Sequence, residues 1–180
     1  MRKLSLQELN RLSPEEYKTR DKHPVVVVLD NIRSANNTGS FFRTSDAFAI
    51  EKIFLCGITA SPPHRDIQKT AIGATNSVDW EYVKSTVLAV QELKAKGYQI
   101  ISVEQCDGSL SLDSYSVNDN IKTAYVFGNE VSGVSQEIID LSDSCLEIPQ
   151  WGTKHSLNVS VSAGIVLWNH VSQLNHLPKK

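Results

Sequence analysis

Apolar and polar stretches alternate along the chain in a way that predicts strands separated by helices. Residues 25–29 read Val-Val-Val-Val-Leu, a β-branched run without polar interruption, which is typical of a strand buried on both faces. Residues 86–96 carry apolar side chains at helical spacing, and Gly97 follows where a helix C-cap belongs. We expect further strands at 52–56, 79–83, 98–103, 124–127 and 145–148, and further helices at 38–48, 134–141 and 157–174. This order predicts an α/β fold with a mostly parallel sheet flanked by helices.

The first 22 residues have a different pattern. Ser13-Pro14-Glu15-Glu16 places a serine at a helix N-cap, a proline at the first helical position and a glutamate at the third. We therefore expect residues 1–22 to form a short helical appendage and residues 23–180 to form the main domain. A chain of 180 residues suits about one such domain.

Composition narrows the class of protein. With 41% hydrophobic and 21% charged residues, the chain has the composition of a folded globular domain rather than of a disordered one. No apolar run approaches the length of a membrane span, and no signal-peptide pattern opens the chain. Three widely spaced cysteines exclude a disulfide framework, and the scattered histidines contain no metal-binding motif. We expect a cytoplasmic protein without a metal ion.

The formal net charge of -2 gives no electrostatic signature of a nucleic-acid-binding protein. Any RNA binding must then depend on a local patch or on individual side chains. Basic residues do gather in the N-terminal appendage, at Arg2, Lys3, Arg11, Lys18, Arg20 and Lys22.

Three polar loops follow predicted strands, and ligands of open α/β sheets bind beyond the carboxyl ends of strands. In the first loop, residues 30–43, Asn37 and Arg43 are six residues apart, about 9 Å along a helix. A helix start with Thr38, Gly39 and Ser40 and a nearby arginine could bind a phosphate. Alternatively, Asn37 only caps the helix and Arg43 pairs with Asp46.

The second loop, residues 128–133, contains Glu130 where a dinucleotide-binding loop requires its middle glycine, and this excludes a GxGxxG fingerprint. Glu130 is a candidate functional carboxylate, or it accepts backbone N–H bonds in a solvated turn.

The third loop, residues 149–158, contains candidates of several kinds. Ser156 could cap the last helix. Asn158 is a poor helix former inside a first turn, which indicates a role for its side chain. Lys154 and His155 are candidates for RNA phosphate contacts, although such residues are commonly only solvated.

Together the three loops resemble the three motifs of the SpoU/TrmH family of SPOUT-class RNA ribose 2′-O-methyltransferases. NIRSANNTGSFFRTSDAF resembles the family's first motif, VFGNEVSGVS its second, and IPQWGTKHSLNVSVSAGIVLW its third. The resemblance covers residues 23–172. One departure is Gln150-Trp151, where the family usually has an apolar residue followed by a small polar one.

The resemblance implies a C-terminal trefoil knot, which general rules of chain topology would not predict. It also implies bound S-adenosyl-L-methionine and a homodimer. The residues that match the family's functional side chains are Asn37, Arg43, Glu130, Ser156 and Asn158. Those expected to hold the cofactor are Phe127, Gly128, Ile148, Ser156 and Leu157, with the strand end at Val103-Glu104 beside them. We expect Arg33, Lys154 and His155 to contact RNA.

The implied reaction is attack of a ribose 2′-hydroxyl on a sulfonium methyl group. Alignment of the reacting atoms supplies much of the rate of such a displacement. A guanidinium is a poor base, so we expect Arg43 to clamp an adjacent phosphate and stabilise negative charge, while the phosphate or a water takes the proton. Asn37, Ser156 and Asn158 would orient the ribose and Arg43, and Glu130 would hold its loop or sit across a dimer interface.

Other readings remain open. The chain could be a catalytically silent RNA-binding scaffold of the same fold. A NAD-dependent enzyme is the other alternative, but the sequence lacks the GxGxxG motif that such an enzyme requires. We expect transfer RNA rather than ribosomal RNA as substrate, because no additional RNA-binding domain precedes residue 23. The last predicted helix is apolar on more than one face, through Leu157, Val161, Ile165, Leu167 and Trp168, and this is compatible with a dimer.

Overall fold

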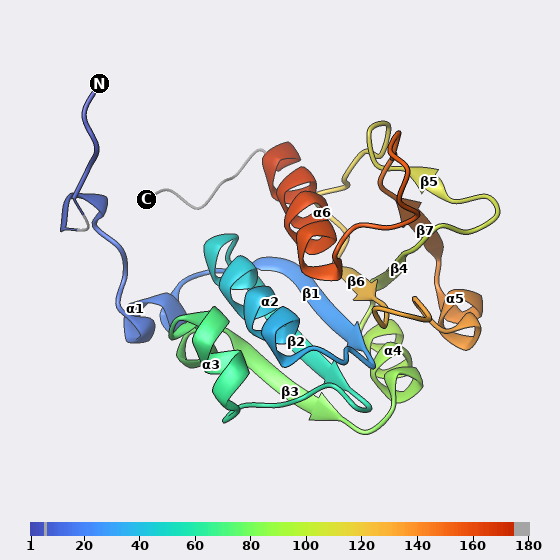
Figure 1. Cartoon of the computed structure of the whole chain (residues 1–180), viewed down its shortest axis with the longest axis horizontal. Coiled ribbons are helices and arrows are strands. Elements are labelled where there is room, and N and C mark those ends of the chain that lie inside the picture. The colour runs from blue at the N-terminus through green and yellow to red at the C-terminus, as the bar shows by residue number, and fades with distance from the viewer. Residues whose placement is uncertain (6, 175–180) are drawn as a thin grey trace.

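The protein, described here by a computed structural model that covers residues 1–5 and 7–174, is built on one seven-stranded sheet (Figure 1). Each pairing between neighbouring strands is parallel, in the order β3-β2-β1-β6-β4-β7-β5. The strands are β1 (His23–Asp30), β2 (Ile50–Cys56), β3 (Asp79–Val83), β4 (Gln99–Val103), β5 (Leu110–Ser111), β6 (Thr123–Phe127) and β7 (Ser144–Glu147). The expected α/β fold with a parallel sheet is confirmed.

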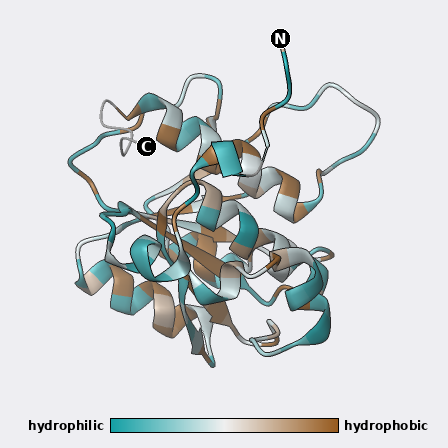
Figure 2. Cartoon of the chain, turned by 90° about the vertical axis from the view of Figure 1, so that its left-hand side faces the viewer, coloured by the Kyte–Doolittle hydropathy of each residue, from teal (hydrophilic) through white to brown (hydrophobic). Residues whose placement is uncertain are grey.

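Helices cover both faces of this sheet. The helices are α1 (Pro14–Thr19), α2 (Ala35–Ala47), α3 (Arg65–Ala71), α4 (Thr86–Ala95), α5 (Gln136–Leu141) and α6 (Val159–Gln173), with short 3-10 turns η1 (Gln7–Leu9) and η2 (Ala74–Asn76). One apolar core lies between the sheet and α2, α3 and α6, and a second lies between the sheet and α4 and α5. Figure 2 shows hydrophobic residues concentrated in the central sheet and hydrophilic ones on the outer loops.

Strand β1 lies at the centre of the fold, and its burial on both faces explains the uninterrupted apolar run in the sequence. Val25, Val27 and Leu29 face the first core, whereas Val26 and Val28 face the second. Both sides of the strand are buried, so neither side needs polar residues. Because β1 pairs with β2 on one side and β6 on the other, the chain winds in opposite directions from this point. The loops after β1 and β6 therefore meet at the topological switch point, where α/β proteins bind their ligands.

The two helices next to these loops begin at residues other than those expected. Helix α2 begins at Ala35, three residues before the predicted start, because the Ser34 side chain, and not Asn37, caps it by accepting the Asn37 N–H at 3.3 Å. Helix α6 begins at Val159, and its N-cap is Asn158 instead of Ser156. The first shift frees the Asn37 side chain from capping, and the second makes the Asn158 side chain the cap of α6.

Helix α3 was not expected from the sequence. Its seven residues bury only Ile67 and Ala71, which gives too weak a periodicity to predict a helix. His64 caps the helix by accepting the Asp66 N–H at 3.2 Å through Nδ1. The proximity of His64 and Asp66 in the sequence therefore reflects a helix start.

In the N-terminal segment the predicted capping box is confirmed, since Ser13 and Glu16 each accept a backbone N–H bond from the other. The next turn of α1 places Tyr17 in the core, and its hydroxyl donates to the Asp46 carbonyl at 3.0 Å. Helix α1 is thus anchored to the main domain. Residues 175–180, the end of the expected domain, lie outside the described residues. Within the described residues, none of the helices has the length and apolar character that a membrane crossing requires.

Candidate active site at the carboxyl edge of the sheet

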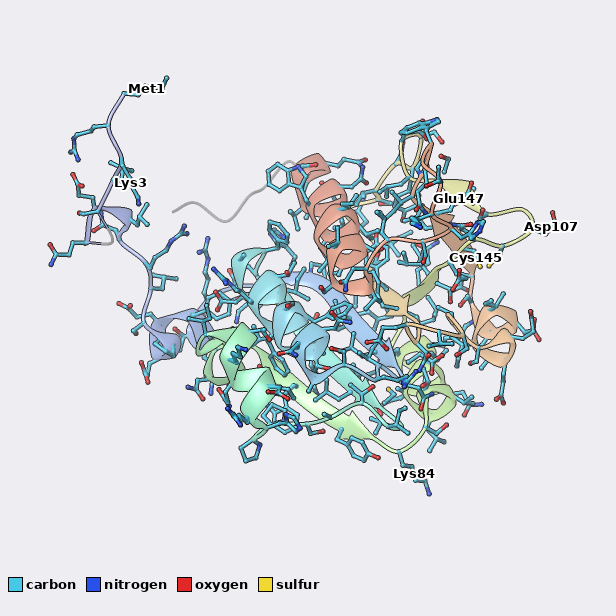
Figure 3. All side chains as sticks on the ribbon, in the orientation of Figure 1. Met1, Lys3, Lys84, Asp107, Cys145 and Glu147 are labelled. Atoms are coloured by element: carbon cyan, nitrogen blue, oxygen red, sulfur yellow. The ribbon has the colours of Figure 1, made fainter. Side chains whose placement is uncertain are left out.

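A cleft of about 680 Å³ opens beyond the carboxyl ends of β4, β6 and β7. Its walls are formed by residues 103–105, 127–134, 147–148, 150 and 156–159, together with Ser162. Figure 3 shows the Glu147 side chain at the end of β7, where one wall begins. Four separate segments of the chain therefore converge on one cavity, as expected for the end of a parallel sheet.

Most of the predicted site residues lie in this cleft. Seven of them are Phe127, Gly128, Glu130, Ile148, Ser156, Leu157 and Asn158. Ile148 and Leu157 add apolar side chains to its walls, whereas the Phe127 ring is 1% exposed and packs against Phe41 in the core, and the loops between them add polar groups. The cleft is thus suited to a ligand with an aromatic base and polar edges.

The turn after β6 is compact because two glycines permit it. A Cβ atom on Gly128 would overlap the backbone of Gly133 and Val134. Within the turn, Asn129 and Gly133 exchange backbone hydrogen bonds of 3.0 and 2.9 Å. Gly133 adopts a positive φ of 69°, and a Cβ there would overlap the carboxylate of Glu104. The absence of both side chains brings the turn against Glu104, which accepts the Val134 N–H at 3.0 Å.

Glu130 joins the two loops that meet at the switch point. Its carboxylate accepts the Arg33 N–H at 2.8 Å, the Ser34 N–H at 3.0 Å and the Asn37 Nδ2 group at 2.9 Å. Burial alone would raise the pKa of Glu130, but these hydrogen bonds outweigh it and hold the pKa below the usual value. Glu130 is therefore ionised at neutral pH, and its three donors at 2.8–3.0 Å come from the β1 loop and the first turn of α2.

Asn37 extends this network to helix α6. The Asn158 Nδ2 group donates to Asn37 Oδ1 at 3.2 Å, while Asn158 Oδ1 accepts the Ser160 N–H at 2.9 Å. The Asn158 side chain thus caps α6 with one atom and binds Asn37 with the other. Through Glu130, Asn37 and Asn158, the three sequence motifs form one continuous hydrogen-bonded chain.

A second carboxylate, Asp30, supports the same loops and was not singled out in the sequence. It is 2% exposed and accepts bonds from Thr86 Oγ1 at 2.6 Å, Asn31 Nδ2 at 2.8 Å and the Ser135 N–H at 3.1 Å. Asn129 Nδ2 in turn donates to the Asn31 carbonyl at 2.7 Å. The sequence did contain a signal for Asp30, since this aspartate directly follows the apolar run of residues 25–29 at the end of β1. A carboxylate buried at such a position needs hydrogen-bond donors around it.

The predicted cationic residues lie outside the cleft. Arg43 is exposed on α2, two turns beyond the helix start, and among the described residues it forms no ion pair or hydrogen bond. The alternative pairing with Asp46 is absent, because Asp46 accepts a bond from Ser77 instead. Arg33 is exposed in the loop after β1. Lys154 and His155 are exposed in the loop between β7 and α6.

The loop between β7 and α6 keeps its backbone available. In the part of the chain that the structure describes, the backbone of residues 149–157 makes one hydrogen bond within the protein, from Gln105 Nε2 to the His155 carbonyl at 2.9 Å. Of these residues, Gln150, Ser156 and Leu157 line the cleft, so their N–H and C=O groups can serve a ligand there. Across residues 1–5 and 7–174, no cluster of three histidine, cysteine, aspartate or glutamate side chains could hold a metal ion.

Comparison with known protein families and curated proteins places these features in context. Residues 24–168 match the family described as the SpoU rRNA Methylase family. The 23S rRNA (guanosine-2'-O-)-methyltransferase RlmB of Neisseria meningitidis is 33% identical over 144 residues, which cover 80% of this chain and 56% of that protein. The tRNA (guanosine(18)-2'-O)-methyltransferase of Aquifex aeolicus is 31% identical over 150 residues, 80% of this chain and 67% of that protein. The chain thus spans about half to two thirds of the length of these two relatives.

Solved structures agree with the sequence match. The crystal structure of the A. aeolicus TrmH/SpoU tRNA modifying enzyme superposes with a TM-score of 0.76 at 29% identity, and covers 89% of this chain and 79% of that one. The SpoU methyltransferase AviRb from Streptomyces viridochromogenes, in complex with AdoMet, shares the fold with a TM-score of 0.77 at 21% identity, over 87% of this chain and 62% of that one. From its match over residues 24–168, this chain belongs to the SpoU rRNA Methylase family.

Proposed function

We propose that this protein transfers a methyl group from S-adenosyl-L-methionine to the 2′-hydroxyl of a ribose in structured RNA. The observation that carries the proposal is the cleft beyond the carboxyl ends of β4, β6 and β7, two of whose lining residues, Glu130 and Asn158, are tied together through Asn37. The names of the two relatives, both RNA 2′-O-methyltransferases, support the same reaction.

The cleft fits the adenosine part of this cofactor. Ile148 and Leu157 offer apolar side chains to the adenine ring, while Gly128 and Ser156 line the same wall and can meet its polar edge and the ribose through their backbone groups. Among the described residues, the backbone of Gln150, Ser156 and Leu157, which line the cleft, makes no hydrogen bond within the protein and can serve the cofactor. When bound, S-adenosyl-L-methionine would supply an electrophilic methyl group.

The residues of the chain itself would act by positioning. The network of Glu130, Asn37 and Asn158 holds the β1 loop, the β6 turn and the start of α6 in one arrangement, so the acceptor ribose meets a rigid rim. The Arg43 guanidinium has only N–H donors, so it would bind the adjacent phosphate and stabilise negative charge on the oxygen. Its exposed position on α2 leaves the guanidinium accessible to RNA. The phosphate or a water would accept the proton.

We further propose that two copies associate through helix α6. Val161, Ile165 and Trp168 are 50%, 37% and 57% exposed, although the opposite side of the helix is already buried in the core. A helix that is apolar on both sides requires a second surface to cover it.

We also propose the trefoil knot that the family resemblance implies. A knotted chain pulled from both termini would extend less than the ~3.4 Å per residue of a free chain, which force spectroscopy can measure.

For the substrate we propose transfer RNA in preference to ribosomal RNA, with the cytoplasm as the place of action. The alternative is a catalytically silent scaffold that binds RNA without modifying it. Mass mapping of 2′-O-methyl groups in tRNA and rRNA, with and without this protein, separates these cases. A new methyl group confined to rRNA would contradict the substrate, and none in either RNA would favour the scaffold.

The role of Arg43 is tested by Arg43→Ala, with Lys84→Ala as the control. Lys84 is also an exposed cation, on a loop beyond β3 (Figure 3). We expect Arg43→Ala to lower the rate of methyl transfer by about 100-fold or more while calorimetry shows unchanged binding of S-adenosylhomocysteine. Transfer at the wild-type rate by Arg43→Ala with bound cofactor would show that Arg43 has no part in the reaction.

A further inference from the structure

The tip of the loop between β7 and α6, residues 151–155, carries an unusually exposed tryptophan. Trp151 is 91% exposed, whereas Trp80 is partly buried and Trp168 packs against Phe48 with ring centroids 5.8 Å apart. Tryptophan is among the side chains that folding buries most on average, because its ring carries a large apolar area. An indole left almost wholly in solvent is therefore available to a partner outside the chain.

The position of this loop tip relates it to the cleft. Gln150, directly before Trp151, lines the cleft, and so does Ser156, directly after His155. The far end of the tip is tied down by the bond from Gln105 to the His155 carbonyl. The indole therefore lies on a loop tip whose two ends border the cleft, where it can meet a nucleotide that flanks the one bound there.

The chemistry around Trp151 favours RNA. Lys154 and His155 are exposed next to it, and residues 148–158 contain no acidic side chain, in a chain whose net charge is -2. Proteins that bind single-stranded nucleic acid combine aromatic faces, on which bases stack, with cations that contact the phosphates. At 91% exposure, the indole also has a ring face that a base can cover.

A protein partner fits this surface less well. The residues that accompany Trp151 in the tip are Gly152, Thr153, Lys154 and His155, so the indole is an isolated apolar group among polar ones. The core of a protein interface is instead depleted of charged residues and contiguous in its apolar area. The exposed apolar side chains of α6, which we assign to a second copy, form a separate row on a helix.

We propose that Trp151 stacks on an unpaired nucleobase of the substrate RNA, next to the nucleotide whose ribose is methylated, with Lys154 and His155 at the flanking phosphates. This inference rests on the proposed function and makes it more specific. Bases inside a duplex present no free face, so the methylated nucleotide lies in a single-stranded loop of a structured RNA.

Fluorescence tests the stacking directly and without activity. In a Trp80→Phe/Trp168→Phe background, Trp151 is the only tryptophan. We expect a 12-nucleotide single-stranded oligoribonucleotide to quench its emission, and a blunt RNA duplex of 12 base pairs to leave it nearly unchanged. Equal quenching by both RNAs, or none by either, would overturn the proposal.

Affinity measurements complete the test. We expect Trp151→Ala to weaken binding of the single-stranded oligoribonucleotide by about 10-fold, Trp151→Phe by much less, and the control Thr153→Ala not at all. Unchanged RNA affinity of Trp151→Ala would overturn the proposal. Weaker binding of S-adenosylhomocysteine by Trp151→Ala would also overturn it, because Trp151 would then cover the cofactor. If Trp151→Ala were a monomer, the proposal would fail as well, because Trp151 would then be a dimer contact.

The two proposals fail separately. If the wild-type protein methylates RNA and Trp151→Ala binds RNA normally, the proposed function stands and the stacking contact is wrong. Wild-type protein that shows quenching by the single strand but transfers no methyl group retains the stacking contact and loses the enzymatic function.

Discussion

At Gly128 the chain approaches itself so closely that one added methyl group would overlap the backbone of Gly133 and Val134. The obstacle is backbone on both sides, so no side chain can rotate away to make room. Gly152, in contrast, has open space around its missing Cβ, although it belongs to a loop of the same cleft. The two glycines therefore respond differently to the same substitution.

We expect Gly128→Ala to lower the free energy of unfolding by about 1–3 kcal/mol and to weaken binding of S-adenosylhomocysteine, because the turn that lines the cleft must open. Gly152→Ala should change the stability by less than about 0.5 kcal/mol. Urea denaturation and calorimetry of the two variants give both quantities. Equal stabilities of Gly128→Ala and Gly152→Ala would contradict the tight turn.

Among the elements, helix α6 connects the site to the core. Its first turn is fixed by Asn158, which caps the helix and binds Asn37. Its last turn is fixed by His170, whose Nδ1 lies 2.9 Å from the Tyr125 hydroxyl of β6. The position of the cleft wall thus depends on contacts at both ends of one helix.

The two roles of Asn158 can be separated. Asn158→Asp retains a side-chain oxygen for the cap but loses the donor to Asn37, whereas Asn158→Ala loses both. We expect Asn158→Ala to cost about 1 kcal/mol of stability, and Asn158→Asp to cost much less. Both should reduce methyl transfer, and denaturation curves with rate measurements check this. A fully active Asn158→Asp would show that the bond to Asn37 is dispensable.

His170 makes the stability depend on pH. Burial, assisted by the nearby His23, lowers its pKa from 6.5 to about 4. Between these values the unfolded chain binds a proton that the folded chain excludes, so stability is present at pH 7 and falls as the pH drops from 6.5 toward 4. We expect a loss on the order of 2–3 kcal/mol over this window. Urea denaturation from pH 7.5 to 4.5 measures it.

His170→Gln removes one titrating group and should reduce this dependence, leaving the part that comes from His23, whose pKa burial also lowers, while His155→Gln, at an exposed position, should retain the wild-type slope. The two variants are compared by the change of stability with pH, since His170→Gln also alters the contact with Tyr125 at every pH. A wild-type slope in His170→Gln would assign the pH dependence to other groups.

For the molecule as a whole, the proposed dimer depends on the exposed apolar row Val161, Ile165 and Trp168 on α6. In a two-fold dimer each substitution occurs twice at the interface, so like charges from both copies would meet. We expect Ile165→Glu to weaken dimerisation by about 100-fold or more. Leu88→Glu, on α4 and 45% exposed, is the matched control and should remain dimeric. Sedimentation velocity measures the oligomeric state of both variants. If Ile165→Glu sediments like the wild-type protein, this face of α6 is not the dimer interface.

Several parts of this architecture could be predicted from the sequence because they depend on local pattern. The apolar run of β1, the capping box at Ser13 and the three polar loops after strands each have a short-range signature. Convergence of the loops followed from the parallel order of strands. Helix α3 and the two-residue strand β5 bury too little to leave such a signature.

The contacts within the site were beyond prediction for a physical reason. Which strand lies next to β1 is decided by long-range packing, so the bonds of Glu130 to the β1 loop could not be read from its own turn. The cap of α6 was assigned to Ser156 because the sequence alone does not fix where a helix begins, and Asn158 can serve as a cap as well. The exposure of Arg43 depends on which face of α2 packs on the sheet.

The bonds of Glu130 span 96 and 97 residues of sequence, and the bond between Asn37 and Asn158 spans 121. A growing polypeptide on the ribosome therefore cannot complete the rim until residue 158 has left the exit tunnel. Loops this long close slowly compared with local helices. A nascent chain would accordingly bind a ligand in the cleft only after the entire sheet has formed. Binding would therefore appear in a single step late in synthesis.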